Sequence, residues 1–333
     1  MRNYIEMSKQ NAISVDIGGT NIRTALINSN GLVSHSQSIS TLPEKGIDKA
    51  AERLSSLIKN TIGKANMSKN SINKTISGIG ISTAGPVNPL NGKYSFPPNL
   101  PTWHQKSFIP ILERKFPNLP VFVGHDATLA ALAETSFGEN KNTKNLIYVT
   151  ISTGVGGGII ADGKMVTGAT GQAGELGHIL VRSDGIKCNV GCLGCFEGNA
   201  SGPAIKKLAE KKYNDFPIGN EINNDFSPEN IINSSKNGDI FAENIVIEVL
   251  ENIAQGLSSI LNIFEPEILV IGGGVTWALK HRLNEIIEMI SSTALPRYRK
   301  KVPIKITSLG ENVSLLGAAE LVFRHPNTKS STS

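Results

Sequence analysis

Residues 13–27, ISVDIGGTNIRTALI, decide the fold because they read as two β-branched runs that meet at a Gly-Gly pair. Paired glycines tolerate positive φ and carry no side chain, so backbone N–H groups can approach an anion closely. The residues of this tip that can contact a bound phosphate or metal ion are Asp16, Gly18, Gly19, Thr20 and Asn21. A carboxylate beside a phosphate cradle predicts that Mg²⁺ lies between them. An ordinary glycine hairpin is the structural alternative.

The same device recurs at residues 147–162, IYVTISTGVGGGIIAD, where Thr153 and Gly154 stand at the tip between two apolar runs. Neither hairpin is a Walker loop, since no G-K-[ST] follows. The second one does not complete G-x-G-x-x-G either, because Ile159 stands where the last glycine belongs. The recurrence predicts a duplicated β-domain that binds one nucleotide.

Length and composition favour a globular protein of two domains. The 333 residues exceed the size that one core usually serves, and 39% hydrophobic with 18% charged residues is ordinary for a soluble protein. The net charge of +5 comes from scattered Lys and Arg, and aromatic residues make up only 5%. Because neither a basic stripe nor a base-stacking surface is present, we expect no nucleic-acid partner.

No apolar run is long enough to span a membrane, and the first residues lack the apolar core of a signal peptide. All three cysteines lie in one short stretch, which is typical of a metal site in a reducing compartment and not of a disulfide framework. We therefore expect a cytoplasmic protein without a membrane partner.

In the first half of the chain, apolar spacing predicts helices at 48–65, 108–115 and 127–137 and strands at 76–82 and 121–123. The proline-rich residues 95–103 form a long loop of the kind that usually covers a site. Asp126 falls at a junction between strand and helix, where the helix N-terminus favours a negative charge. A plain N-cap aspartate is the structural alternative.

In the second half, Ser227 and Pro228 predict a helix start, and a long helix at 239–264 stops before Pro266. A strand at 268–271 then enters Gly273 and Gly274, where a ligand can lie on bare backbone. A helix at 280–292, a strand at 304–307 and a last helix to about 323 complete the fold. Residues 326–333 are predicted to be a disordered tail.

The cysteine stretch, together with a nearby histidine, has the ligand types of a structural zinc site. The four residues are His178, Cys188, Cys192 and Cys195. Their spacing, C-x₃-C-x₂-C, also resembles the iron–sulfur signature of radical S-adenosylmethionine enzymes. That interpretation is disfavoured because no (β/α)₈ alternation precedes the stretch.

Eight ordered motifs resemble those of the ROK family of repressors and sugar kinases, over residues 13–323. They are DIGGTN, GIGISTAGPVNPLNG, PPNLPTW, HDATLAALAE, TGVGGGI, GELGH, the C…C…C-F-E stretch and PEILVIGGGV. The resemblance implies an α/β protein with the two-domain actin-like ATPase (ribonuclease H-like) fold, duplicated β-hairpin phosphate loops and an interdomain cleft that closes on the sugar. It implies domains at 1–124 and 125–309, with the helix at 310–325 returning to the first, and a homodimer or homotetramer.

Carried over residue by residue, the resemblance implies that Asp126 is the catalytic base, which accepts the proton of the sugar 6-hydroxyl. It implies sugar contacts by Gly85, Asn99, His125, Asp126, Glu175, His178 and Glu197. It implies MgATP binding by Asp16, Gly18, Gly19, Thr20, Asn21, Thr153, Gly154, Gly273 and Gly274. It implies a structural zinc ion held by His178, Cys188, Cys192 and Cys195.

The implied activity is ATP-dependent phosphorylation of a hexose, either glucose or an N-acetylhexosamine such as N-acetylmannosamine. The alternative is a sugar-responsive transcriptional repressor without catalysis. Repressors of the family carry an N-terminal helix-turn-helix, for which the residues before Ile13 are too few. The intact Asp126 also favours the kinase.

Two positions depart from the family pattern. Val190 stands where the second cysteine belongs, so either Cys192 supplies the missing thiolate through a rearranged loop or the metal is weakly bound or absent. His125 stands where the family has Asn beside the catalytic Asp, and that Asn holds a ring hydroxyl. Histidine can donate a similar hydrogen bond, or it can simply pack at the end of the strand.

Overall fold

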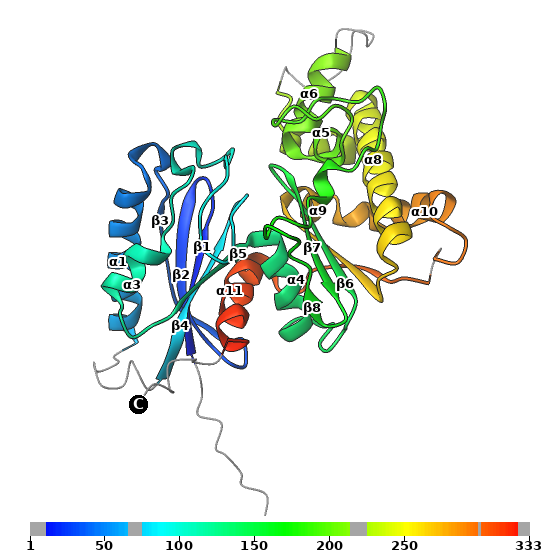
Figure 1. Ribbon diagram of the computed structural model, residues 1–333. Helices are drawn as coiled ribbons and strands as arrows, with labels where there is room; N and C mark the ends of the chain where they lie inside the picture. Colours follow the sequence, from blue (N-terminus) through cyan, green and yellow to red (C-terminus); the bar gives the residue numbers. More distant parts are fainter. Residues whose placement is uncertain (1–10, 66–74, 214–224, 299–300, 326–333) are drawn as a thin grey trace, which may run out of the picture. The chain divides into compact units, whose positions relative to one another are not determined.

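The computed structural model describes residues 11–65, 75–213, 225–298 and 301–325 (Figure 1). The predicted tail at 326–333 lies outside the described residues. The chain divides into two compact units, and each is described by itself. Within the described residues, the first unit comprises 11–142, 165–173 and 309–325, and the second comprises 143–164 and 174–308 apart from the gaps given above.

The first unit contains a five-stranded sheet with the order β3-β2-β1-β4-β5. Its strands are β1 (Asn11–Ile17), β2 (Asn21–Asn28), β3 (Val33–Ser40), β4 (Ile76–Thr83) and β5 (Val121–His125). The first three strands are antiparallel, whereas β4 and β5 run parallel to β1. Ile17, Thr83 and His125 lie in register, so the carboxyl ends of β1, β4 and β5 share one edge of the sheet.

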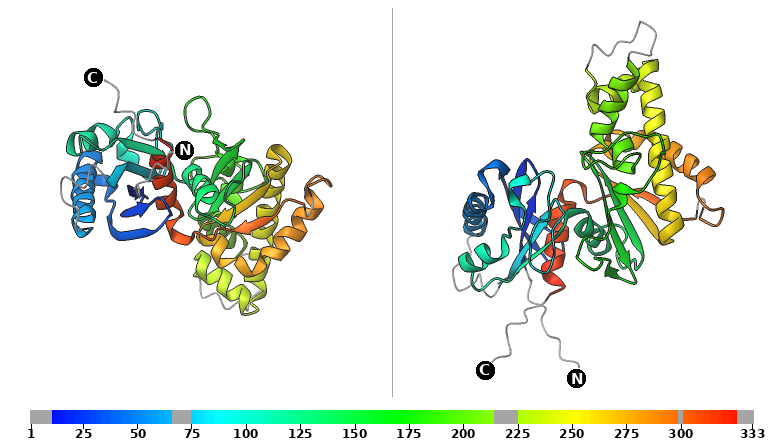
Figure 2. Two further views of the ribbon diagram at one scale, coloured as in Figure 1. Left: turned by 90° about the horizontal axis from the view of Figure 1, so that it is seen from below. Right: turned by 45° about the horizontal axis from the view of Figure 1, so that its top comes forward.

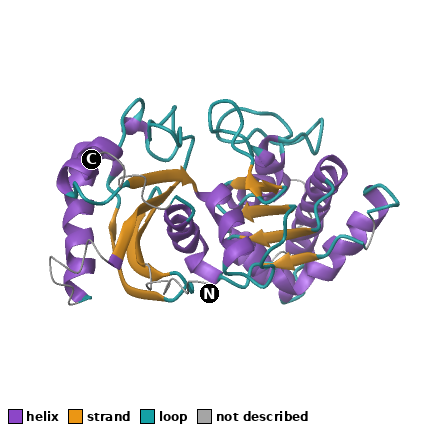
Figure 3. Cartoon of the chain, turned by 60° about the horizontal axis from the view of Figure 1, so that its bottom comes forward, coloured by secondary structure: helices purple, strands orange, loops and turns teal. Residues whose placement is uncertain are grey.

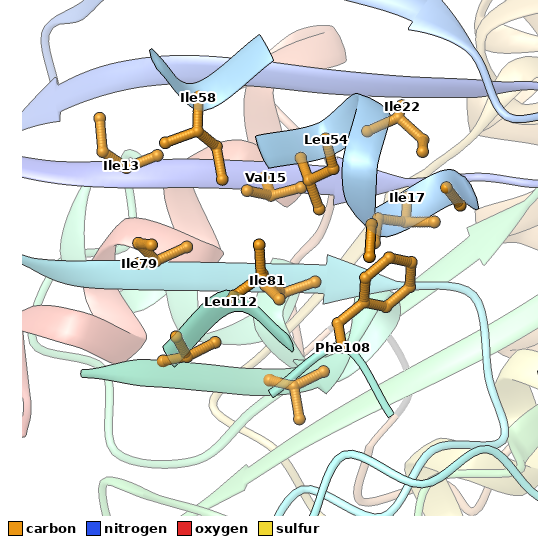
Figure 4. Packing of buried hydrophobic residues seen from close by; sticks show 14 of the residues in the cluster. Ile13, Val15, Ile17, Ile22, Leu54, Ile58, Ile79, Ile81, Phe108 and Leu112 are labelled. Carbon is orange, nitrogen blue, oxygen red and sulfur yellow. The ribbon is translucent and has the colours of Figure 1, made fainter. Parts of the chain in front are cut away.

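Side chains alternate between the two faces of this sheet. One face is built from large aliphatic residues such as Ile13, Val15 and Ile81, which pack against Leu54 and Leu112 (Figure 4). These partners belong to α1 (Ile47–Lys64) and α3 (Ile109–Lys115). The opposite face of β4 carries small residues, which allow α11 (Val313–Phe323) to lie close to the strand. Figure 2 shows α1 and α11 on opposite sides of the sheet.

The second unit repeats the arrangement, with the strand order β10-β9-β6-β7-β8. Its strands are β6 (Leu146–Ile151), β7 (Val155–Ala161), β8 (Lys164–Met165), β9 (Ile268–Gly272) and β10 (Ile304–Ile306). As in the first unit, an antiparallel hairpin extends into two parallel strands on the side of its first strand. The predicted duplication of a hairpin-bearing α/β domain is therefore confirmed.

The remaining helical segments, which Figure 3 draws in purple with the others, pack beside the sheets or against other helices. In the first unit they are η1 (Pro43–Lys45), η2 (Pro101–Trp103), α4 (Asp126–Ser136) and η5 (Gly310–Asn312). In the second they are η3 (Leu176–His178), α5 (Phe196–Ala200), α6 (Gly202–Tyr213), α7 (Pro228–Lys236), α8 (Ile240–Phe264), α9 (Gly274–Ala278), η4 (Lys280–Arg282) and α10 (Leu283–Thr293). None of the described helices is long and apolar enough to cross a membrane.

Most predicted elements are found within a few residues of their predicted ends. Ser227 is confirmed as an N-cap, since its side chain accepts a hydrogen bond from the N–H of Asn230 at 3.3 Å. The pattern missed β3, whose sequence VSHSQSIS is mostly polar because the strand lies at an edge of the sheet. The second domain was predicted to begin at residue 125, but in the structure the first segment of the first unit extends to residue 142. It includes α4 because this helix packs against α11.

Candidate functional site

The first glycine tip is held by a residue that the sequence analysis did not single out, the buried Thr41. Its hydroxyl donates a hydrogen bond to the carbonyl of Gly18 at 2.7 Å, and its N–H donates to the carbonyl of Thr20 at 2.7 Å. The N–H of Gly18 donates to the carbonyl of Asn21 at 2.9 Å. Thr20 and Asn21 are exposed, so the braced tip presents its polar groups outward. No local pattern marks Thr41, since its partners lie about twenty residues earlier.

Asp16, at the end of β1, makes an ion pair with Arg23 on β2. The guanidinium donates to Oδ2 from Nε at 3.1 Å and from Nη2 at 2.7 Å, and Nη2 also donates to the carbonyl of Glu311. Burial raises the pKa of the Asp16 carboxyl, and the negative charge of Asp126 adds to this, while Arg23 lowers it. Asp16 and Asp126 therefore interact electrostatically, and an additional cation near them would stabilise both charged forms.

The loop before η2 lies against the first glycine tip. A Cβ atom placed on Gly19 would lie 3.1 Å from Cβ of Asn99, and the Asn99 side chain is exposed. The loop is anchored by the fully buried Trp103, whose ring packs edge-to-face on Tyr94 and Phe108 at centroid distances of 5.5 and 5.1 Å. The structure thus brings Asn99 to the phosphate-type tip of the same unit.

Asp126 is the first residue of α4, and it follows directly on β5. Its Oδ1 accepts a hydrogen bond from the N–H of Ala127 at 2.6 Å. His125, not Asp126, occupies the N-cap position, and it makes no side-chain cap. Because β1, β4 and β5 end at one edge, the structure gathers Asp16, Gly85, His125 and Asp126 there, next to the first glycine tip. The carboxyl ends of parallel strands are where ligand sites typically lie.

The second glycine tip, between β6 and β7, contacts a residue predicted to bind sugar. Oε2 of Glu197 accepts a hydrogen bond from the N–H of Val155 at 3.1 Å. The N–H of Ser152 donates to the carbonyl of Gly154 at 2.8 Å, which closes the turn, and Thr153 is exposed. Glu197 therefore orders the second tip in this structure, a contact that its position in the sequence did not reveal.

The glycines after β9 lie beside this second tip because β9 runs parallel to β6, with Gly272 in register with Thr150. Gly273 has φ of 92°, and a Cβ there would lie 2.3 Å from the carbonyl oxygen of Ile151. Only glycine fits this position. Gly274, which begins α9, is exposed. The second unit thus brings together the four residues Thr153, Gly154, Gly273 and Gly274.

The segment GELGH forms η3, which places Glu175 and His178 one turn apart. Nε2 of His178 lies 3.8 Å from Oε2 of the exposed Glu175. The other ring nitrogen, Nδ1, is buried and has no hydrogen-bond partner among the described residues. A buried ring nitrogen without a partner is costly unless it binds an ion or water.

The cysteine turn lies close to the His178 ring. Ligand atoms of His178, Cys188 and Cys192 all lie within 4.8 Å of one another. The turn is closed by hydrogen bonds from the N–H of Cys188 to the carbonyl of Cys192 at 3.0 Å and from Gly191 to Cys188 at 3.1 Å. Val190 points outward, with 54% of its surface exposed. The tight turn therefore brings Cys192 close to His178 and Cys188, while Val190 stays outside this group of potential metal ligands.

The three thiols differ in their electrostatics. Burial favours the neutral form of Cys188, but hydrogen bonds from the N–H groups of Val190 and Cys192 and from the thiol of Cys195 lower the pKa of Cys188 below its usual value. Burial raises the pKa of Cys192, and it raises that of Cys195 to about 11. Sγ of Cys195 accepts a hydrogen bond from the N–H of Gly198 at 3.4 Å, and Cys195 is not a member of the three-residue group.

Comparisons with known proteins agree with the sequence motifs. The ROK family model matches residues 12–325. A glucokinase of Thermotoga maritima is 29% identical over 323 residues, which cover 95% of this chain and 98% of that protein. A xylose repressor of Caldicellulosiruptor bescii is 31% identical, and the match covers 93% of this chain and 77% of the repressor.

The fold is also shared with solved structures. A ROK family glucokinase from Streptomyces griseus, in complex with glucose and AMPPNP, aligns with a TM-score of 0.77 at 27% identity, covering 95% of this chain and 100% of that chain. The two-unit α/β architecture expected from the motifs is thereby confirmed as that of ROK sugar kinases, the actin-like ATPase fold.

Proposed function

Since this chain belongs to the ROK family, we propose that it transfers a phosphoryl group from MgATP to the 6-hydroxyl of a hexose. The observation that carries the proposal is the position of Asp126. Its carboxylate lies at the edge where β1, β4 and β5 end, close enough to Asp16 for the two charges to interact. A general base beside a phosphate-type glycine tip is the arrangement that phosphoryl transfer to an alcohol needs.

In the proposed reaction, Asp126 accepts the proton of the 6-hydroxyl while the hydroxyl oxygen forms a bond to the γ-phosphorus. The bond from phosphorus to the bridging oxygen breaks, and ADP leaves. A carboxylate oxygen can take the proton late in the transfer, as the bond to phosphorus forms. The loose transition state requires mainly positioning and neutralisation of charge.

We assign the phosphates to the first tip, at Gly18, Gly19, Thr20 and Asn21, and to the second, at Thr153 and Gly154. Gly273 and Gly274 are assigned to the adenosine. When bound, Mg²⁺ would neutralise phosphate charge and stabilise the negative charge that develops on the leaving ADP. Asp16 fits this ion because a carboxylate whose pKa is raised by burial and by Asp126 is stabilised by a nearby cation.

We assign sugar contacts to Gly85, Asn99, Glu175, His178 and Glu197, as the resemblance implies, and treat His125 below. Glu175 precedes η3 and His178 ends it, and Oε2 of Glu175 lies 3.8 Å from Nε2 of His178, so both can bind neighbouring hydroxyls. Glu197 has one oxygen on the N–H of Val155, which leaves the other for a ligand. Glu197 would thereby couple sugar binding to the second tip.

We further propose that a structural zinc ion binds at His178, Cys188 and Cys192, with Cys195 as the fourth ligand after a small adjustment. Ligand atoms around tetrahedral zinc are about 3.8 Å apart, and the three atoms already lie within 4.8 Å of one another. The buried Nδ1 of His178 would gain a partner, and Nε2 would stay free to contact the sugar.

Zinc is expected at about one ion per chain in protein purified without chelators, as measured by elemental analysis. Cys192→Ser should lower that content at least about tenfold, because the serine hydroxyl is a poor zinc ligand at neutral pH. Val190→Ser is the matched control in the same turn, and it should retain the metal since Val190 points outward. Metal-free protein with full activity would contradict the assignment.

A sugar sensor without catalysis is the second candidate, and the similarity to a xylose repressor favours it. A measurement of ADP release separates the kinase from the sensor. ADP release with MgATP should be stimulated by at least one of glucose, mannose, fructose, N-acetylglucosamine and N-acetylmannosamine. Preference for an acetamido sugar would mean that the site accommodates a substituent at C2. Sugar binding by calorimetry without ADP release from any of the five would contradict the kinase and favour the sensor.

A further inference from the structure

We propose that His125 is a positioning residue that orients Asp126 by holding Oδ1, so that Oδ2 receives the proton of the acceptor hydroxyl. The inference rests on the proposed kinase function and deepens it. It gives His125 a role different from the sugar contact that the family's Asn implies at this position.

Distances around the carboxylate distinguish its two oxygens. Nε2 of His125 lies 3.4 Å from Oδ1 of Asp126, the same oxygen that accepts the 2.6 Å hydrogen bond from Ala127. No described residue donates a hydrogen bond to Oδ2, and 38% of the Asp126 side chain is exposed. One oxygen is therefore engaged by the start of α4, and the other is open to a ligand.

The imidazole is confined by backbone on its Nε2 edge. A Cβ atom placed on Gly85 would lie 2.5 Å from Cδ2 and 3.1 Å from Nε2 of His125. Gly85 follows β4, and β4 pairs with β5 in a register that sets Thr83 opposite His125. The glycine thus leaves room for the ring edge, and the pairing of β4 with β5 brings Gly85 beside His125. His125 is only 24% exposed in its side chain.

The 3.4 Å between Nε2 of His125 and Oδ1 of Asp126 is longer than a strong hydrogen bond. Catalytic hydrogen bonds are often this long before substrate binds. A shift of a few tenths of an ångström would bring Nε2–H to bonding distance. Carboxylates whose orientation is fixed by two donors on one oxygen present the other oxygen in a single direction, and this lowers the cost of reaching the reactive geometry.

Two substitutions test the role, because they place an amide donor at different points of the imidazole. The side-chain nitrogen of Gln reaches the position of Nε2, whereas that of Asn reaches the position of Nδ1. With the sugar that the wild type phosphorylates best, His125→Ala should lower kcat about 10-fold or more with KM for the sugar nearly unchanged. His125→Gln should recover most of the loss, and His125→Asn should resemble Ala.

Rescue by Asn and not by Gln would overturn the inference, and so would a rise in KM at unchanged kcat, since both would mean a sugar contact. Equal kcat in all three variants would overturn it as well. Thermal unfolding of each variant excludes loss of the fold as the cause. A wild type that is inactive with all five sugars refutes the kinase itself, and the inference with it. That outcome is recognised in the wild-type control before any variant is compared.

Discussion

Asp126→Asn should lower kcat by about 10³-fold while sugar affinity stays within about threefold of the wild type. The amide is the same size as the carboxylate and its oxygen can still accept the N–H of Ala127, so α4 should start at the same residue. It cannot accept the proton of the 6-hydroxyl at neutral pH. Steady-state ADP release gives kcat, and calorimetric titration with the preferred sugar gives affinity.

Asp239→Asn is the matched control, since Asp239 also stands at a helix start and its side chain accepts a hydrogen bond from Ala242 at 2.8 Å. Removing that charge should leave kcat unchanged, because Asn caps helices as well as Asp. If Asp126→Asn retained normal turnover, Asp126 would be only a helix-start residue and the base assignment would be refuted. If sugar affinity fell together with kcat, Asp126 would act in ground-state binding.

Gly80→Ala should lower the free energy of unfolding of the first unit by about 3 kcal/mol. A Cβ atom on Gly80 would lie 1.9 Å from the carbonyl oxygen of Ala318 and 2.7 Å from its carbonyl carbon. Both atoms are backbone of α11, so no side-chain rotation relieves the overlap. The helix would have to move away from β4, and the small-residue face of the sheet would lose its packing.

Urea unfolding followed by tryptophan fluorescence measures this effect. The chain has two tryptophans, and a Trp277→Phe background leaves the buried Trp103 as reporter of the first unit. Gly63→Ala, in α1, is the control because a Cβ there would meet nothing within 4 Å. It should stabilise by about 0.5–1 kcal/mol through helix propensity. Equal effects of the two substitutions would show that α11 does not approach β4 as described.

The local part of this protein follows from its residues alone. The β-branched runs on either side of Gly18 and Gly19, and the second set around Gly154, predict both hairpins because strand and turn propensities act within a few residues. The Ser-Pro start at Ser227 and the periodicity of α8 are local in the same way. The ordered motifs also carried the resemblance to the ROK family, which the family match now supports.

The contacts that decide the candidate site join residues far apart in the chain. Thr41 bonds to Gly18, Arg23 bonds to the carbonyl of Glu311, and Glu197 bonds to Val155. Each depends on which strands pair, in which register, and on how closely a helix packs. None leaves a periodic or compositional signal in the sequence.

The cysteine turn shows the same limit over a short distance. The sequence left open whether Cys192 could stand in for the cysteine missing at position 190. Only the turn between Cys188 and Cys192, with Val190 outward, brings Cys192 within reach of His178.

By itself, therefore, the sequence determined the residue types, the two glycine hairpins and most helices, because these depend on local propensity and pattern. The tertiary structure alone decided which of those residues meet, because hydrogen-bond and ligand geometry depends on strand register and backbone packing over long separations.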